Sequence, residues 1–184
     1  MQHKIRFSAA AACLAGALLC SACQSLIPQA QGLASAQWAA QNYQRQDQIE
    51  VQWKEHGFSF LLYQQQQGRS IEMLALSLTG QQLFKLHFDG QKVQVEQRIA
   101  QMKRLPFDYV VRDILYATYP GFAALHAGQA SVEQKNGEQI VYIQQRPVLK
   151  IARQDDAVEL ANLQVPYQMV ISAVSNTLQN DGGV

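Results

Sequence analysis

The chain has 184 residues, a formal net charge of +1, a sequence pI near 7.7 and only 16% charged residues. It shows no concentration of Lys and Arg of the kind that a phosphate backbone requires, so nucleic acid is not an expected partner. Glutamine replaces much of the usual charged surface, and these amides are interleaved with apolar residues. The length allows one ordinary domain with one core.

The beginning of the chain has the composition of a secretory leader. A positively charged start precedes an apolar stretch at residues 7–19, which is too short to span a bilayer, and Ser21 and Ala22 directly precede Cys23. This ending resembles a bacterial lipobox. The resemblance implies a signal peptide over residues 1–22 and a mature chain that begins at an acylated Cys23, with palmitate among its acyl chains. An ordinary secretory leader with a chance cysteine is the alternative.

The residue after the acceptor cysteine bears on the destination. In enteric-type bacteria Asp at that position signals retention in the inner membrane, so Gln24 implies a lipid-anchored outer-membrane protein whose domain faces the periplasm. Several acyl chains on one cysteine give stable anchoring. All three cysteines lie within the first 23 residues, so the mature domain forms no internal disulfide and its core holds by packing. We expect a flexible tether at residues 23–35, one domain at residues 36–178 and a disordered tail at residues 179–184.

The first part of the domain changes from helical to strand periodicity. Residues 36–46 are compatible with a short amphipathic helix that carries Trp38 and Tyr43. Residues 49–53 alternate apolar and polar side chains, as a half-buried strand does, and Gly57 breaks this strand.

Two further strands are predicted before the first clear hairpin. Residues 58–63 form one, and a glutamine-rich turn at residues 64–68 follows it. The next strand is expected to direct Leu74, Leu76 and Leu78 to one face, and Thr79 and Gly80 end it.

The middle of the chain holds the clearest strand and the helix. Residues 84–88 alternate strongly, Asp89-Gly90 is a favoured two-residue hairpin turn, and residues 93–99 form the returning strand. A helix of about three turns then begins after Pro106 and closes at Pro120-Gly121. One face of this helix is apolar at the spacing i, i+3, i+4, through Phe107, Val110, Val111, Ile114, Leu115 and Thr118.

The last third returns to strands after a short apolar link at residues 122–125. Residues 130–135 and 138–145 flank Asn136-Gly137, another strong hairpin signal, and residues 148–153, 157–163 and 167–173 complete the pattern. The total of about 9–11 antiparallel strands with one central helix predicts a mainly β (α+β) fold with a sheet large enough to curl.

Nothing in the mature sequence indicates catalysis, a metal or a cofactor. His56, His87 and His126 have no metal-ligand spacing, no GxSxG nucleophile turn occurs, and Asp155-Asp156 is typical of a solvated hairpin tip. We therefore expect a protein that is not an enzyme. An enzyme acting on an envelope lipid stays open only if the fold brings distant polar residues together.

A small basic cluster precedes the helix. Arg98, Lys103 and Arg104 lie close together in the sequence. They either form a solvated loop or contact anionic lipid head groups.

Large apolar side chains are numerous for one thin core. In a sheet curled around a helix they face a common interior, which they either fill or line as a cavity for an apolar ligand. The sequence leaves both outcomes open. The candidates for such a cavity wall are Trp53, Phe58, Phe60, Leu62, Leu74, Leu76, Leu78, Phe84, Leu86, Phe88, Val111, Ile114 and Leu115.

Several segments along the domain carry a family resemblance. They are Phe58-Ser59-Phe60-Leu61-Leu62, residues 76–86, Phe88-Asp89-Gly90, Leu105-Pro106, Arg112-Asp113-Ile114-Leu115 and Tyr119-Pro120. Together they resemble a small family of bacterial outer-membrane lipoproteins that are often encoded beside aryl polyene pigment synthesis genes.

That family in turn resembles LolA and LolB, the periplasmic carrier and the outer-membrane receptor of lipoproteins. The resemblance implies an unclosed antiparallel half-barrel with the helix as a lid over an apolar cavity, and a lipid-like ligand delivered with a periplasmic carrier protein as partner. LolB presents an apolar residue on a protruding loop, whereas the predicted turns at residues 64–68 and 79–82 are polar. The alternative function is an accessory lipoprotein that docks an envelope complex through a sheet edge or the helix.

Overall fold

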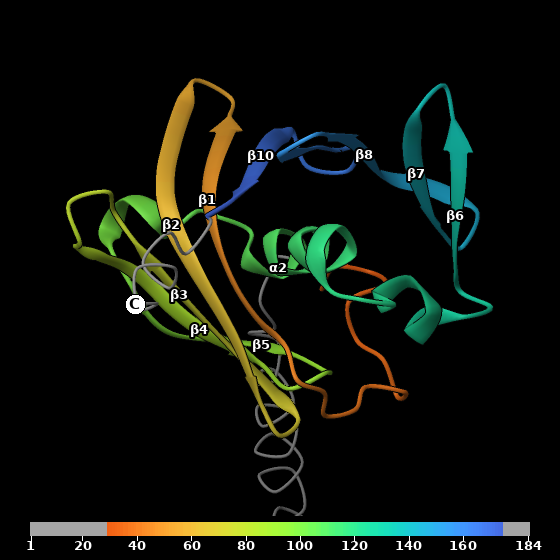
Figure 1. The fold of residues 1–184 in the computed structure, drawn as a ribbon, viewed down its shortest axis with the longest axis horizontal. Helices are drawn as coiled ribbons and strands as arrows, with labels where there is room; N and C mark the ends of the chain where they lie inside the picture. Colours follow the sequence, from red (N-terminus) through yellow and green to blue (C-terminus); the bar gives the residue numbers. More distant parts are fainter. Residues whose placement is uncertain (1–28, 175–184) are drawn as a thin grey trace, which may run out of the picture.

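The computed structural model describes residues 29–174, which form ten antiparallel strands and one α-helix (Figure 1). The expected mainly β fold is confirmed. The predicted leader, the lipidation site Cys23 and the predicted tail at residues 179–184 lie outside the described residues.

The elements follow one another as two groups of five strands with the helix between them. The first group is β1 (Gln44–Trp53), β2 (His56–Gln67), β3 (Ser70–Leu76), β4 (Gln82–Phe88) and β5 (Val93–Arg98). A short 3₁₀ turn at Ala100–Met102, the helix α2 (Phe107–Thr118) and a second 3₁₀ turn at Phe122–His126 come next. The second group is β6 (Ala130–Lys135), β7 (Glu138–Ile143), β8 (Arg146–Gln154), β9 (Ala157–Asn162) and β10 (Tyr167–Ala173).

The strands form one curved sheet in the order β5-β4-β3-β2-β1-β10-β9-β8-β7-β6. Each group is a simple meander, and the two meanders join where β1 pairs with β10, for example Ile49 with Ile171. Strands β5 and β6 are the two edges, so the described sheet is not closed into a barrel. The chain between these edges contains α2, which lies in the hollow of the curve (Figure 1). The result is an unclosed half-barrel around a helix.

The core lies between α2 and the concave face of the sheet. The helix buries Phe107, Val110, Val111, Ile114 and Leu115, the apolar face expected from their spacing. Pro106 precedes the first turn, where a missing N–H costs nothing. The predicted helix is therefore confirmed at both ends.

The predicted hairpin at Asn136-Gly137 is confirmed. These residues have φ of 53° and 83°, as a tight turn between β6 and β7 requires. The connection after β4 is longer than the predicted two-residue turn, because residues 89–92 all lie outside strands. The Asp89 carboxylate accepts hydrogen bonds from the backbone N–H groups of Gln91 and Lys92 at 2.8 and 2.9 Å, and these bonds lower its pKa.

The segment before β1 departs from the prediction in two ways. The predicted flexible tether extends to residue 35, but Ala30, Leu33 and Ser35 are buried. Residues 36–46 were expected to be helical, but the chain runs without a helix to Gln44, where β1 begins. Packing at Trp38 overrides the weak helical preference of this segment. The Trp38 indole N–H donates to the Arg69 carbonyl at 2.7 Å, and its ring stacks on Tyr119 at a centroid distance of 5.0 Å.

The predicted glutamine turn is strand instead. Strand β2 continues to Gln67, and the turn to β3 lies at Gly68, which has φ of 59°. Gln64 and Gln66 point into the core, where their amides are satisfied by hydrogen bonds. Gly57 likewise lies within β2, opposite Gln52, rather than ending a strand.

Candidate functional site

Most of the predicted cavity residues form a solid core. Phe60, Leu62, Phe84, Leu86 and Phe88 are buried on β2 and β4, and Val111, Ile114 and Leu115 meet them from α2. Phe84 makes edge contacts with Phe60 and with Phe107, at centroid distances of 5.5 and 5.0 Å. None of these residues lines any of the three cavities described below. This part of the half-barrel is filled by side chains.

Two predicted residues lie where β1 and β2 turn. Trp53 and Phe58 are half-buried against the core. Phe58 also lines a cavity of about 370 Å³ between β1, β2 and β10. The two side chains thus border the core at one end rather than facing its centre.

The predicted inward face of β3 is wrong. Ile71, Met73 and Ala75 are buried, whereas Leu74 and Leu76 lie on the other face and are only half-buried. The cause is the tight turn at Gly68, after which Ile71, Met73 and Ala75 pair with Gln66, Gln64 and Leu62, the inward residues of β2. Leu78 lies beyond the end of β3, in the loop to β4, and is 62% exposed. The predicted polar turn at residues 79–82 is therefore preceded, in the same loop, by an exposed leucine.

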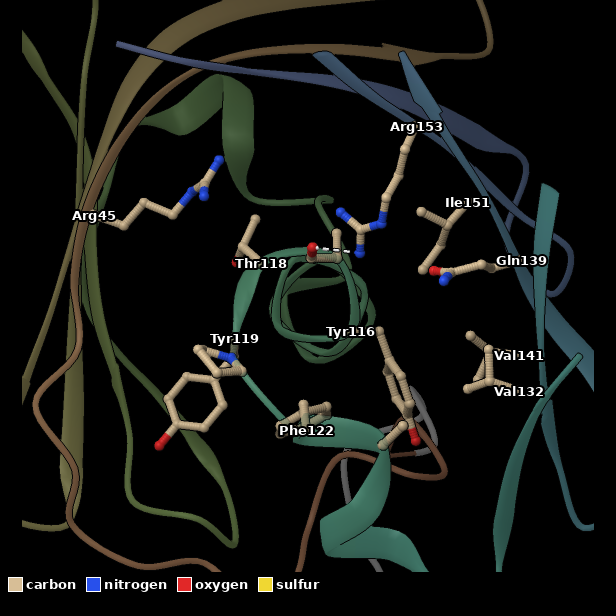
Figure 2. Close-up of a pocket in the computed structure, with 14 residues that line it drawn as sticks. Arg45, Tyr116, Thr118, Tyr119, Phe122, Val132, Gln139, Val141, Ile151 and Arg153 are labelled. Atoms are coloured by element: carbon tan, nitrogen blue, oxygen red, sulfur yellow. Dashed lines mark hydrogen bonds between the residues drawn. The ribbon is translucent and has the colours of Figure 1, made fainter. Parts of the chain in front are cut away.

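An open cleft lies on the other side of α2, facing β6, β7 and β8. It has a volume of about 410 Å³, and we call it the α2 cleft. Residues 116–123, at the end of α2 and in the turn after it, form one wall. Val132, Gln139, Val141 and Ile151 form the opposite wall (Figure 2). The walls combine apolar side chains with polar ones, including Thr118 and Gln139, and more of the accessible lining is polar than apolar.

Tyr116 forms much of the helical wall. Its ring extends from α2 between Phe122 and the pair Val132 and Val141 (Figure 2), and it meets Phe122 edge-on at 4.9 Å. Its hydroxyl is buried and has no hydrogen-bond partner among the described residues. Burial raises the pKa of Tyr116 to about 12, so the phenol stays neutral.

Two arginines enter the cleft from opposite sides. Arg45 comes from β1 and Arg153 from β8, and both reach toward the end of α2 (Figure 2). Both also line a neighbouring cavity of about 620 Å³, which shares Ala117 with the α2 cleft. The two cavities therefore share both arginines as lining residues.

Arg45 is held by a buried carboxylate. Its Nε lies 2.8 Å from both oxygens of Asp47, and its Nη2 lies 2.7 Å from Oδ1. The amide of Gln64 donates to Asp47 at 3.1 Å and accepts from the Tyr43 hydroxyl at 3.2 Å. The buried polar groups on β1 and β2 thus form one connected network beside the cleft.

Arg153 is held by the helix. Its Nη2 donates to the carbonyl of Ala117 at 2.9 Å. Ala117 is in the last turn of α2, where carbonyl groups lack partners within the helix and a cation is favourable. No carboxylate of the described residues lies within ion-pair distance of Arg153.

A second polar network fixes the helix in the half-barrel. The Arg112 Nε donates to Asp113 at 2.8 Å, and Asn162 donates to the same carboxylate at 2.6 Å. The Tyr167 hydroxyl also donates to Asp113. Arg112 donates in addition to the Gln31 carbonyl at 3.2 Å. Because all three charged or phenolic side chains are buried, this network positions α2, β9, β10 and the N-terminal segment rather than forming an accessible site.

The other predicted chemistry candidates do not converge. His56 is exposed, His87 lies on the outer face of β4, and His126 is buried near the carbonyls of Leu33 and Phe122. No group of three or more His, Cys, Asp or Glu in the described part of the chain is arranged to hold a metal ion. Within residues 29–174 no helix is long and apolar enough to cross a membrane. Asp155 and Asp156 lie in the turn between β8 and β9, as expected.

The sequence did not reveal the α2 cleft. Its arginines belong to strands that are far apart in the chain, and Arg45 lay within a predicted helix. Tyr116 is on α2 but outside the apolar face that the spacing identified. Only the apolar residues 122–125 and the alternation around Val141 and Ile151 pointed to buried surface in this region.

Comparison with known proteins gives a family and little more. No curated protein matches the chain at a significant level. A family model described as protein of unknown function (DUF3261) matches residues 44–175, which is all of the curved sheet and the helix. The chain therefore belongs to the DUF3261 family.

Proposed function

We propose that this protein is a non-catalytic, lipid-anchored protein of the outer membrane, whose periplasmic domain binds a hydrophobic ligand and helps to place it in that membrane. The ligand class is a lipid, the acyl chain of a lipoprotein or a lipid resembling an aryl polyene. The acylated Cys23 supplies the anchor, and a periplasmic carrier protein is the expected donor. The family of outer-membrane lipoproteins and the LolA and LolB relationship inferred from the sequence support this assignment.

The α2 cleft carries this proposal. It is open, about 410 Å³ in volume, and walled by Tyr116, Phe122, Val141 and Ile151 in a half-barrel whose other half is solid. Sites for small apolar molecules are concave, apolar and equipped with a few polar groups. The cleft is concave like such sites, but its lining mixes polar and apolar side chains, which fits an amphiphilic ligand, and the end of α2 forms one of its walls.

Leu78 supports the transfer step. It is 62% exposed in the loop between β3 and β4. LolB likewise presents an apolar residue on a protruding loop. We infer that Leu78 enters the lipid surface when ligand is released, which gives this exposed residue a function.

Ligand binding is tested by extracting the protein, purified from producing cells, with organic solvent and analysing the extract by mass spectrometry. The matched variant is Ala123→Trp, because Ala123 lines the cleft and is only half-buried, so a larger side chain fills the space. Ala161→Trp is the control, since Ala161 is half-buried on β9 and lines none of the three cavities.

We expect a lipid from the native protein and from Ala161→Trp, and little from Ala123→Trp. Circular dichroism of all three proteins checks that the sheet is intact. Recovery of no lipid from the native protein, or equal recovery from the filled variant, overturns the assignment of the cleft.

A docking function is the second candidate, favoured by the free edge at β6. Among the described strands it pairs with β7 alone, and all its residues except Ala130 are exposed, including Val132 at 42%. Such an edge can accept another strand. A photo-cross-linker at Glu133 captures one defined protein partner under this hypothesis, and extraction then yields no lipid.

A further inference from the structure

We infer that the ligand of the α2 cleft is an amphiphile with an anionic end group, a carboxylate or a phosphate, and that Arg153 binds this group with Arg45 opposite. This inference rests on the proposed function and adds to it the chemical class and the orientation of the ligand. The arginines are on strands β8 and β1, and the fold brings them to the same end of α2 (Figure 2).

Arg153 has free hydrogen-bonding capacity at this position. A guanidinium carries five N–H donors in a rigid fork. The described residues use Nη2, which donates to Ala117 at 2.9 Å, and leave Nε and Nη1 for another acceptor. Capping of the helix accounts for the bond from Nη2 to Ala117, but it gives no role to Nε and Nη1. The contact also holds the guanidinium in place, so binding an anion costs little further side-chain entropy.

Arg45 contributes a fixed charge rather than a free one. Asp47 is fully buried and binds Nε and Nη2 of Arg45, while the Arg45 side chain remains 32% exposed. The pair is close to neutral as a whole, but its cationic end is the part that lines the cleft, because Asp47 does not line it. An anion between the two arginines therefore meets positive charge on both sides.

The distribution of acids sets the orientation. The residues that line the α2 cleft include both arginines and neither Asp nor Glu. The neighbouring cavity of about 620 Å³ is lined by Asp155 and Asp156, which repel an anion. The anionic group thus lies at the arginines, and the apolar tail extends toward Ala123 and Val132, apolar residues of the cleft that keep accessible surface.

The test uses the fluorescent fatty acid cis-parinaric acid and its methyl ester, which differ in charge and share one chain. Binding to the full mature protein is followed by fluorescence at neutral pH, below the micelle concentration of each probe. We expect the acid to bind at least about ten-fold more tightly than the ester, and Arg153→Gln to remove this preference by weakening the acid alone. Competition with dodecanoate, dodecyl phosphate and dodecanol separates the carboxylate and phosphate sources.

The controls separate charge from structure. Arg146→Gln changes an exposed arginine of the same strand that lines none of the three cavities, and is expected to keep the preference. Arg153→Lys is expected to restore part of it. Equal binding of acid and ester to the native protein overturns the anionic assignment and leaves the proposed function standing. Failure of both probes to bind, together with an empty solvent extract, overturns the proposed function itself.

Discussion

The hydroxyl oxygen of Tyr43 lies 3.0 Å from that of Thr118, so the residue before β1 is joined directly to the last residue of α2. The Tyr43 hydroxyl also lies 3.2 Å from the Gln64 amide oxygen, and the Thr118 hydroxyl lies 2.7 Å from the Ile114 carbonyl. With one proton each, the two hydroxyls fill two of these three contacts at a time. This chain of bonds connects the N-terminal segment, the helix and β2 at the margin of the α2 cleft. Tyr116 differs from Tyr43 in this respect, because its buried hydroxyl has no hydrogen-bond partner in the described structure.

The two phenols predict opposite responses to loss of a hydroxyl. Tyr43→Phe is expected to lower the free energy of unfolding by about 1–2 kcal/mol, because buried groups of Gln64 and Thr118 lose a partner. Tyr116→Phe is expected to leave it unchanged or raise it by up to about 1 kcal/mol, since it removes an unsatisfied polar atom. Urea titration of both variants measures the difference. Equal destabilisation by the two changes contradicts the hydrogen-bond assignment.

Alkaline pH is expected to unfold the domain through its buried tyrosines. Burial raises the pKa of Tyr43 and of Tyr116 from 10.0 to about 12, and raises the pKa of Tyr167 as well. Their contribution to stability is fully present below pH 10 and is lost as the pH rises through the raised values. Each tyrosine should reduce the free energy of unfolding by about 1.4 kcal/mol per pH unit in that window. Urea titrations at stepped pH, with tyrosinate absorbance, check the slope, and Tyr116→Phe should make it shallower.

The side-chain-filled core around Phe84 is expected to be strongly destabilised when a large side chain is shortened. Phe84→Ala removes a ring that contacts Phe60 and Phe107, and should cost about 3–5 kcal/mol of unfolding free energy. Leu78→Ala, at an exposed position, should cost less than about 0.5 kcal/mol. Chemical denaturation of both variants measures the contrast. A small loss for Phe84→Ala would show that this region is a loosely packed cavity wall after all.

Removing the arginine of the buried ion pair Arg112–Asp113 is expected to destabilise the protein to an extent that depends on pH. Arg112→Met leaves the Asp113 carboxylate buried without its cation and should cost about 3–5 kcal/mol at neutral pH. Burial raises the pKa of Asp113, and the Arg112 charge acts against this rise. In the variant the loss should therefore shrink as the pH falls and the carboxyl group takes up a proton. Thermal unfolding at pH 7 and pH 5 checks this, with Arg146→Met as the surface control.

Membrane contact is expected to depend on Leu78. Leu78→Glu should leave the unfolding free energy within about 0.5 kcal/mol and reduce transfer of bound probe to anionic lipid vesicles several-fold. Leu163→Glu is the matched control, because Leu163 is also exposed, at 45%, in the loop between β9 and β10. Probe release to vesicles, followed by fluorescence, measures the effect. If both variants reduce probe transfer equally, the effect comes from the added negative charge and not from the loop that carries Leu78.

The regular elements were predictable because their signals are local. The helix spacing from Phe107 to Leu115 and the Asn136-Gly137 turn each depend on a few neighbouring residues, and the structure has both where they were expected. For strand β3, the sequence did not predict which side chains face the core. Glutamines near Gln64 look like a turn in sequence, and only contacts with Asp47 and Tyr43 show that their amides can be buried.

The site was predictable only in its general chemistry. Apolar surface for a ligand was expected, but the residues with the clearest alternation, such as Phe84 and Leu86, are also those that pack most completely. A cleft remains where packing is incomplete, and this is a property of several segments together. Arg45 and Arg153 come within one cleft only because β1 and β8 belong to the same curved sheet.

The pairing of β1 with β10 has a consequence for how the chain folds. Each meander is made of neighbours in sequence and can assemble as soon as its own strands exist. Their junction joins Asp47 to Ala173 and Trp53 to Tyr167, across almost the whole domain. Such distant pairing is slow, because a long loop must close first. The two meanders therefore join only after β10 has been synthesised. Until then one edge of β1 is unpaired and can pair with a strand of another chain.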